Sequence, residues 1–503
     1  MTENVVVLGA GMAGLCTALA IAPTGRSVTL LERDAAPPEG VEATFDQWSR
    51  RGASQLRHSH AFLARMRKLI GDEHPVLLEA LEAAGARELR FADGLPPSLK
   101  PGYRPAPGDA DMSILVSRRT TLEYIMRRYV EAHPNVAIRS GVFVSGLISE
   151  RNASGALVAR GLRSDDGEAC LADIVIDAGG RGSPIADWLL DAGATFIDEG
   201  EDCAILYYTR FYALNDGHSE PPRGLAPPNG DLGFLKFGVF PADNDTFSVT
   251  LAVPDVEQVM RAAVVRPETF DAICANLPGV APWTDSARSR PVSKVYAMGD
   301  LKSRWREMTP GGAPAALGLF CVGDSLVRTN PLYGRGCSFA AIEAHLLRDI
   351  LNRSADPVER ARAYSGRSRV ELFTFYADMV EQDRAAAKRA LAGLDPDHKP
   401  SLRGRLLRAF LEDGVAITIR QDIGLLREAM RAFHMLDQPR AWLRKPGNLA
   451  KILRVWARGR GANAALYAPK PGPERPAMFA VLGLDANTDL ARVRAEGLSL
   501  IHI

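Results

Sequence analysis

Three closely spaced glycines near the amino terminus constrain the fold of this chain more than any other feature. The segment Gly9–Gly14 follows a β-branched run at residues 4–8 and precedes an apolar helical run at residues 15–22. A short β-branched run of this kind is typical of a strand buried on both faces of a parallel sheet. Strand, glycine turn and helix in this order predict the first βαβ unit of a dinucleotide-binding domain.

Each glycine has a physical reason in such a unit. Gly9 makes the tight turn, Gly11 lets the backbone approach a pyrophosphate, and Gly14 allows the helix to pack closely on the strand. The free amides at the helix start, which include those of Met12 and Ala13, carry partial positive charge that attracts the anion. We therefore predict that these five residues contribute to a dinucleotide site.

A second strand, residues 27–31, ends in Glu32, which lies 18 residues after Gly14. An acid at about this distance accepts hydrogen bonds from the ribose hydroxyls of an adenosine, so Glu32 and its neighbour Arg33 are predicted cofactor residues. A carboxylate disfavours a ribose 2′-phosphate. The pattern therefore predicts NAD or FAD at this site rather than NADP.

The composition fits a large folded protein and excludes several other classes. The 503 residues include 61 Lys and Arg against 60 Asp and Glu, and 46% are hydrophobic, so neither a disordered chain nor a nucleic-acid-binding protein is indicated. Six cysteines without a C-x-x-C pair or metal-ligand spacing predict no disulfide framework, no metal site and a reducing, cytoplasmic location. The uncharged stretch at residues 5–24 contains three glycines and follows no positive region, which disfavours a signal peptide or spanning helix.

A second glycine-rich turn lies far downstream. An apolar strand at residues 317–322 leads to Gly323 and Asp324, and the Pro- and Gly-rich loop at residues 330–336 opens a helix rich in small residues. This second helix start also favours an electron-rich ligand, and Asp324 is placed to accept hydrogen bonds from hydroxyl groups. Gly323 and Asp324 are therefore predicted cofactor residues.

Together the two motifs resemble the FAD-dependent monooxygenases with a p-hydroxybenzoate-hydroxylase-like fold. The resemblance implies that Asp324 holds the flavin ribityl chain and that Pro331 lies beside the isoalloxazine ring. It implies that the backbone around Gly334 and Gly336 stabilises negative charge on the reduced ring. Pro331 and Tyr333 then form the catalytic floor, and no general acid or base is assigned.

Two further segments support the resemblance. Residues 117–123 match the family's Arg-x-x-Leu element, whose arginine contacts the FAD diphosphate region. Arg119 has the correct spacing, and Arg118 is the alternative. The strand at residues 142–144 resembles the segment whose backbone recognises adenine, which adds Val144 to the predicted site.

The family's Asp-Gly-type motif is present in altered form at residues 172–183, because Ala178 follows the aspartate. This departure leaves the contact with a nicotinamide open. The electron donor implied by the resemblance is therefore either NAD(P)H or a partner flavin reductase, with O2 as the oxidant.

Residues 50–60 resemble the Gln-x-x-His-x-His stretch of bacterial epoxidase-like members, including flavin epoxidases that act on polyene precursors of polyether products. In those members the stretch lies against the flavin, so Gln55, Arg57 and His58 are predicted cofactor neighbours. His58 and His60 are two residues apart and would point in different directions on a helix, which disfavours a shared metal. The alternative is that at least one of the two histidines is simply buried and hydrogen-bonded.

The flavin elements occupy two separate stretches, so the segment between them is predicted to be an insertion. Alternating aromatic and polar residues at 206–213, 233–240 and 246–252, with a turn at 241–245, predict an antiparallel substrate sheet that contains a hairpin. Its aromatic residues are either pocket-lining or plain core, and the predicted substrate residues are Tyr208, Tyr212, Phe237 and Phe247.

The predicted fold class is thus α/β, with a Rossmann-like FAD-binding domain, an inserted antiparallel sheet and a C-terminal helical region. The predicted domains are 1–190 (FAD-binding, first part), 191–295 (antiparallel substrate domain), 296–360 (FAD-binding, second part), 361–470 (helical region) and 471–503 (tail).

The helical region is basic on an otherwise neutral chain. Residues 401–460 contain 13 Lys and Arg against 5 Asp and Glu, a local net charge of +8. The helices there are amphipathic, which fits either peripheral docking on an anionic membrane that stores an apolar substrate or a solvated basic face. The oligomeric state is not predicted.

The activity implied is insertion of one oxygen atom from O2 into an apolar small molecule, by epoxidation or hydroxylation, through a flavin C4a-hydroperoxide that the protein keeps dry. A geranylgeranyl-reductase-like alkene reductase has a similar Asn-Pro-Leu loop and is one alternative. A flavin-dependent halogenase is another, although no two of the six tryptophans lie two residues apart as its Trp-x-Trp stretch requires. A non-enzymatic binding scaffold is the third alternative.

Overall fold

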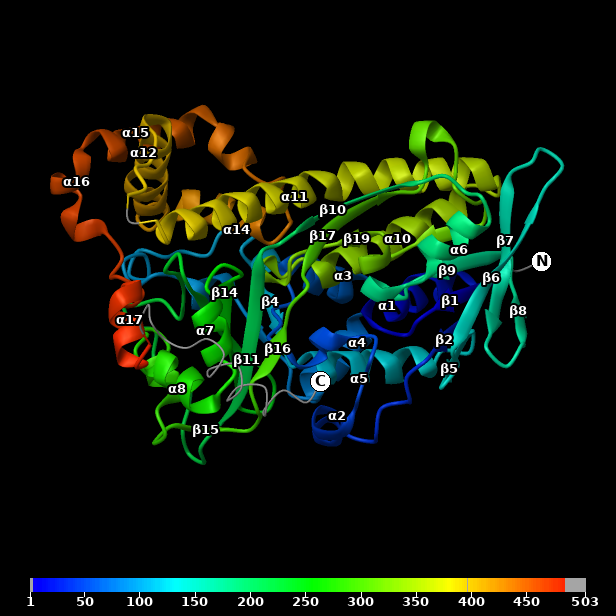
Figure 1. The fold of residues 1–503 in the computed structure, drawn as a ribbon, viewed down its shortest axis with the longest axis horizontal. Helices are drawn as coiled ribbons and strands as arrows, with labels where there is room; N and C mark the ends of the chain where they lie inside the picture. Colours follow the sequence, from blue (N-terminus) through cyan, green and yellow to red (C-terminus); the bar gives the residue numbers. More distant parts are fainter. Residues whose placement is uncertain (1–2, 396, 485–503) are drawn as a thin grey trace.

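The computed structural model describes residues 3–395 and 397–484 (Figure 1). Its central element is a five-stranded sheet in which every strand runs parallel to its neighbours. Across the sheet the order is β18 (Leu319–Cys321), β9 (Ile174–Asp177), β1 (Asn4–Leu8), β2 (Ser27–Glu32) and β5 (Val136–Ser140). Because all five strands are parallel, the turns that follow β1, β9 and β18 lie at the same edge of the sheet.

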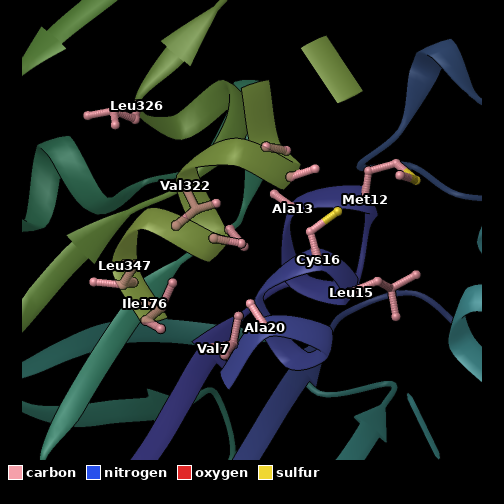
Figure 2. Packing of buried hydrophobic residues seen from close by; sticks show 14 of the residues in the cluster. Val7, Met12, Ala13, Leu15, Cys16, Ala20, Ile176, Val322, Leu326 and Leu347 are labelled. Carbon is pink, nitrogen blue, oxygen red and sulfur yellow. The ribbon is translucent and has the colours of Figure 1, made fainter. Parts of the chain in front are cut away.

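Helices and a small second sheet cover the parallel sheet. Helices α1 (Met12–Ile21), α10 (Gly336–Arg353) and α5 (Arg119–Glu131) pack in one hydrophobic core with it, and α1 is in direct contact with both other helices. Figure 2 shows Val7 of β1, Ile176 of β9 and Ala20 of α1 in this cluster. The strands of the small antiparallel sheet, which packs on β1 and β9, are β6 (Val144–Arg151), β7 (Leu157–Ser164) and β8 (Ala169–Leu171).

The predicted inserted sheet is present and antiparallel. Its strands are β12 (Asn229–Asp231), β13 (Lys236–Pro241), β14 (Thr246–Pro254), β11 (Ile205–Leu214), β15 (Ser289–Pro291) and β16 (Tyr296–Met298). The pairing of β13 with β14 is the predicted hairpin, with Pro241 opposite Phe247 at its end. Helices α7 (Gln258–Ala263), α8 (Pro267–Ala275) and α9 (Ala281–Thr284) pack against this sheet in a second hydrophobic core.

A ribbon of two long strands links the two main sheets (Figure 1). Strand β10 (Ile197–Asp202) pairs with β17 (Lys302–Glu307), which also pairs with β19 (Val327–Arg328). The 37-residue helix α11 (Pro357–Gly393) runs beside this ribbon. The remaining elements of the first 200 residues are α2 (Val41–Gln47), α3 (Ala64–Glu73), α4 (Pro75–Ala83), α6 (Ile185–Asp191), β3 (Arg87–Leu89) and β4 (Ile114–Val116).

The carboxyl-terminal region is helical, as predicted. Its elements are α12 (Leu402–Ala409), a π-helical segment (Phe410–Ala416), α13 (Ile417–Ile419), α14 (Ile423–Phe433), α15 (Pro446–Ala457), α16 (Gly459–Ala462) and α17 (Arg475–Val481). Across residues 3–395 and 397–484, no helix is long and apolar enough to cross a membrane. The same residues contain no group of three or more His, Cys, Asp or Glu side chains suited to hold a metal ion.

The prediction of a tail from residue 471 onward is wrong for part of that stretch. Helix α17 packs its Met478 and Phe479 into the core of the antiparallel sheet, where both side chains are buried. This helix was not predictable from the sequence because prolines precede it and only one turn carries apolar residues. Residues 485–503 of the predicted tail lie outside the described residues.

Candidate functional site

A large cavity is lined both by the carboxyl edge of the parallel sheet and by the antiparallel sheet. Its volume of about 1880 Å³ exceeds the roughly 300–1,000 Å³ typical of a site for one drug-sized ligand. The cavity therefore has room for an extended dinucleotide together with a second small molecule. The predicted cofactor residues that line it are Gly9, Gly11, Met12, Ala13, Glu32, Arg33, Gln55, His58, Arg119, Val144, Gly323, Asp324, Pro331, Gly334 and Gly336.

The turn before α1 is built from contacts that only glycine permits. Gly9 has a φ of +94°, and a Cβ on it would lie 2.8 Å from the carbonyl oxygen of Ala178. A Cβ on Gly14 would lie 2.1 Å from the carbonyl oxygen of Gly9. Gly14 does not line the cavity, and its position behind the turn fits the packing role predicted for it.

Arg50 is a residue of this site that the sequence analysis missed. A Cβ on Gly11 would lie 3.8 Å from each terminal nitrogen of the Arg50 guanidinium, which therefore lies beside the start of α1. Its Nη2 donates to Glu32 Oε2 at 2.5 Å and its Nη1 to Glu123 Oε2 at 2.6 Å. Its Nε is buried and makes no hydrogen bond. A guanidinium held at a helix start is suited to an anionic group such as a pyrophosphate.

Glu32 lies at the end of β2 and is only 4% exposed. Its Oε2 accepts a hydrogen bond from the Ala10 amide at 2.8 Å, and its Oε1 accepts one from the Asp34 amide at 3.0 Å. Two backbone donors and Arg50 therefore hold the carboxylate in one orientation at the cavity wall. A fixed acceptor of this kind is suited to ribose hydroxyl groups.

Arg119, at the first position of α5, reaches the same part of the cavity. Its Nε donates to Glu123 Oε1 at 2.6 Å, and its Nη1 donates to His60 Nε2 at 3.2 Å. Burial alone would raise the pKa of Glu123, but Arg119 and Arg50 hold that pKa below its usual range. Glu123 is thus an ionised, fully buried carboxylate that positions both arginines.

Arg118, the alternative in the sequence analysis, has a different role. Its Nε and Nη2 donate to Asp243 Oδ2 at 3.0 and 2.7 Å, its guanidinium also donates to Glu42, and it lies 4.8 Å from the centre of the Phe45 ring. Arg118 therefore joins the start of α5 to the turn of the β13–β14 hairpin. It does not line the cavity, so Arg119 is the arginine that faces a ligand.

The segment at residues 54–60 lies between the two sheets. His58 Nδ1 is hydrogen-bonded to Thr209 Oγ1 at 2.9 Å on β11. Burial lowers the pKa of His58 to about 4 and that of His60 to about 3, with Arg119 adding to the second shift. Both imidazoles are therefore neutral at neutral pH. Gln55 lines the cavity beside them.

Arg57 does not reach the cavity, and its prediction as a cofactor neighbour is wrong. Its Nε donates to the carbonyl oxygen of Phe45 at 2.9 Å, and its Nη2 donates to that of Asp46 at 3.2 Å. These bonds turn the side chain toward the end of α2. A spacing pattern alone does not distinguish this direction from the opposite one.

The turn after β18 meets the first helix start. A Cβ on Gly323 would lie 2.7 Å from the Cβ of Ala13 on α1, and the Gly323 amide donates to Glu343 Oε2 of α10 at 2.5 Å. Figure 2 shows Ala13 beside the segment that contains Val322. The turns after β1 and β18 are therefore in contact. Asp324, which follows, lines the cavity, and burial raises its pKa although Arg119 opposes this effect.

Asp383 of α11 holds the loop that is predicted to lie at the flavin face. It is a second residue that the sequence analysis did not predict. Asp383 Oδ1 accepts hydrogen bonds from Asn330 Nδ2 at 2.8 Å and from the Tyr333 hydroxyl at 2.9 Å. Asn330 Oδ1 in turn accepts one from the Tyr207 hydroxyl at 2.5 Å. These bonds fix Asn330, which precedes Pro331, and Tyr333, which lies two residues after it. Pro331 and Tyr333 both line the cavity.

Of the four predicted substrate residues, Phe237 alone lines the cavity. Tyr208, Tyr212 and Phe247 lie in the core between the antiparallel sheet and its helices, so the prediction that they line a pocket is wrong. Tyr212 stacks on Phe247 with ring centroids 5.3 Å apart. Since side chains alternate along a strand, the cavity face of β11 carries Tyr207 and Thr209 instead.

Comparisons with known proteins agree with this geometry. Residues 4–93 match the family model described as FAD dependent oxidoreductase. Protein Rv3254 of Mycobacterium tuberculosis is 26% identical over 372 residues, which are 70% of this chain and 74% of that protein.

Two solved structures share the fold. The Diels-Alderase PyrE3 from the biosynthetic pathway of pyrroindomycins is similar with a TM-score of 0.58 at 18% identity, covering 87% of this chain and 81% of its own. PqsL of Pseudomonas aeruginosa, a probable FAD-dependent monooxygenase, is similar with a TM-score of 0.53 at 16% identity, covering 78% of this chain and 99% of its own.

The chain has the fold of an FAD-dependent oxidoreductase. The predicted fold class and the predicted enzyme class, an FAD-dependent oxidoreductase, are thereby confirmed. Of the two dinucleotides that Glu32 left open, the comparisons support FAD. The epoxidase-like subgroup stays a prediction.

Proposed function

We propose that this oxidoreductase is a flavin-dependent monooxygenase that inserts one oxygen atom from O2 into an apolar small molecule. The observation that carries the proposal is a continuous cavity, with the glycine turns after β1 and β18 in contact at one side and apolar walls at the other. The fold shared with PqsL supports a monooxygenase, and that with PyrE3 shows that this fold also serves other reactions.

The residues that would hold FAD line one part of the cavity wall. The amides at the start of α1, with Arg50 and Arg119, suit the diphosphate, and Glu32 suits the adenosine ribose. Asp324 suits the ribityl hydroxyls. When bound and reduced, FAD supplies the activation of O2 and the transfer of one of its oxygen atoms.

The remainder of the cavity suits an apolar substrate. Its walls include Leu89, Leu95, Phe237, Val239 and Leu332 from several different elements. Such walls exclude water from the space next to the flavin-face loop, which protects a reactive oxygen species from side reactions. The chain's role in the reaction is therefore mainly to bind, orient and keep dry.

The polar groups of this space hold their protons rather than transfer them. Burial raises the pKa of Tyr207 well above its usual value, and burial together with Asp383 raises that of Tyr333. Both phenols therefore remain hydrogen-bond donors. His58 and His60 are neutral, but with pKa values lowered to about 4 and about 3 they are weak bases, so neither is suited to hold a proton at neutral pH.

The direct test is product mass after reaction with apolar alkenes and aromatic compounds, using 18O2 and either NAD(P)H or a flavin reductase as electron source. A gain of one 18O atom, absent without O2, is the expected result. A gain of two hydrogens would identify an alkene reductase instead, and a halogen gained on addition of halide would identify a halogenase.

A pair of variants ties the activity to the cavity. Asp324→Ala should lose flavin and product together, because it removes the carboxylate at the second helix start. The matched control is Asp191→Ala, at an exposed position at the end of α6. Unchanged product formation by Asp324→Ala would contradict the proposed FAD site, whereas flavin bound with no product from any substrate would contradict only the monooxygenase activity.

A further inference from the structure

Helix α12 presents leucines to solvent on a helix with no buried residue. Leu402 is 70%, Leu406 59% and Leu407 57% exposed, and Leu411 in the next turn is 46% exposed. A surface helix normally turns its apolar side chains toward the core. Here the apolar side chains point outward instead, which requires a reason outside the folded monomer.

The leucines of α12 are exposed although this region has a hydrophobic core. The helices of this region have a core of their own, made by Val415, Leu425 and Ile452. Helix α12 continues directly into the π-helical segment Phe410–Ala416, and helix α15 packs against that segment. Both helices lie at one end of the molecule, at the upper left of Figure 1. Helix α15 adds two partly exposed leucines, Leu449 and Leu453.

Unpaired positive charge accompanies this apolar surface. Among residues 3–395 and 397–484, no carboxylate lies within ion-pair distance of Arg403, Arg405, Arg454 or Arg458. Arg408, by contrast, donates to Glu412 at 2.7 Å. The surface thus combines exposed leucines with cations that have no carboxylate partner among the described residues.

We propose that this surface docks on an anionic lipid bilayer. We define it as the outer helical surface, formed by Leu402, Leu406, Leu407, Leu411, Leu449, Leu453, Arg403, Arg405, Arg454 and Arg458. Leucines that enter the acyl boundary and arginines that contact lipid phosphates are the combination by which amphipathic helices bind membranes. A second copy of the chain is a poorer occupant, because the same arginines would face one another.

The outer helical surface is also connected to the cavity. Helix α14 packs into the core under this surface through Leu425, and it lines the cavity with Leu426 and the 47% exposed Phe433. An apolar substrate dissolved in the bilayer would therefore enter beside α14. This route rests on the proposed function, whereas membrane docking itself does not.

The test is cosedimentation of the full-length protein with vesicles of phosphatidylcholine alone and of phosphatidylcholine with phosphatidylglycerol. We expect binding only to the anionic vesicles and a loss of binding as salt is raised. Leu406→Ser with Leu407→Ser should weaken binding roughly tenfold or more. Arg403→Gln should weaken it about fivefold, as expected for one cation near an anionic surface.

The matched control is Leu171→Ser on β8, which removes a leucine of similar exposure, 67%, from another part of the surface. Its vesicle binding should equal that of the wild type. All the substituted side chains are exposed, so thermal unfolding should be unchanged in each variant. Binding that is absent, equal on neutral vesicles, or equal in the Leu406/Leu407 variant would overturn the proposal. Self-association abolished by that variant, without vesicle binding, would instead identify a second copy as the occupant.

Discussion

Arg118 and Arg119 are adjacent in the chain, but one stabilises the fold and the other faces the cavity. Arg118 makes a buried ion pair with Asp243 that ties α5 to the β13–β14 hairpin, whereas Arg119 faces the cavity beside Glu123. Removal of one partner from a buried ion pair costs about 3–5 kcal/mol. Both side chains are nearly inaccessible to solvent, so both substitutions lower stability, and the difference lies in ligand affinity.

We expect Arg118→Gln to lower the free energy of unfolding of the apoprotein by about 3 kcal/mol while FAD affinity of the folded protein stays near the wild-type value. Arg119→Gln should lower FAD affinity at least tenfold, because it removes a cation from the cavity wall. Urea denaturation and FAD titration measure the two effects separately. Equal FAD affinities for the two variants would contradict the assignment of Arg119.

The buried histidines predict acid lability. In the folded protein the pKa values of His58 and His60 are lowered to about 4 and about 3, mainly by burial. Between the unfolded pKa, near 6.5, and these values the unfolded chain binds more protons than the folded one, so stability falls as pH is lowered. The loss is about 1.4 kcal/mol per pH unit for each histidine.

Urea denaturation of the apoprotein between pH 7.5 and pH 5 checks this expectation. His58→Gln should reduce the slope of stability against pH, and the exposed His218→Gln should leave it unchanged. A His58→Gln variant that keeps the wild-type slope would show that this imidazole is not buried and neutral in the folded protein.

At the scale of elements, glycines in helices divide into those that a neighbour requires and those that nothing requires. Gly14 lies where a Cβ would meet the Gly9 carbonyl oxygen at 2.1 Å, whereas Gly366 in α11 has no atom within 4 Å of its hypothetical Cβ. Gly14→Ala should therefore displace α1, lower stability by several kcal/mol and weaken FAD binding. Gly366→Ala should raise the free energy of unfolding by about 0.5–1 kcal/mol. Urea denaturation midpoints of the two variants, each compared with the wild type, measure these effects. A destabilised Gly366→Ala variant would count against the helix assignment.

Helix α17 belongs to the antiparallel sheet rather than to a tail. Phe479→Ala removes a ring that is 5% exposed and should cost about 3–5 kcal/mol. Val481→Ala, at 53% exposure on the same helix, should change stability by less than about 0.5 kcal/mol. Similar small effects for both, measured by thermal and urea unfolding, would place α17 outside the core.

These elements also show where sequence reasoning succeeds and where it stops. The β1–α1 unit and the β13–β14 hairpin were predictable because each has a local signal: glycine spacing in one, alternation around a polar turn in the other. The face of β11 was not predictable, since both faces of that strand are covered and alternation alone does not say which of Tyr207 and Tyr208 meets the cavity. Arg50 and Asp383 reach the site through contacts with residues that are far away in the sequence, and no local sequence pattern predicts such contacts.

At the scale of the whole molecule, the chain brings residues from its first 60 positions, from 119 and from 323–336 to one cavity, and Asp383 holds the loop at residues 330–333. The contact between Ala13 and Gly323 holds the start of α1 against the turn after β18 before any ligand binds. Preorganisation of this kind lowers the entropic cost of ordering the site when the ligand binds. We therefore expect one FAD in each chain to bridge the start of α1 and the turn after β18.

The most direct measurement is the stoichiometry and affinity of FAD bound by the purified protein, obtained from flavin absorbance and fluorescence titration of the apoprotein. We predict one FAD per chain for the wild type and none retained by Gly323→Val, whose side chain would fill the contact with Ala13 between the two helix starts. A wild-type chain that binds no FAD, or a Gly323→Val variant that binds it as tightly as the wild type, would contradict the account.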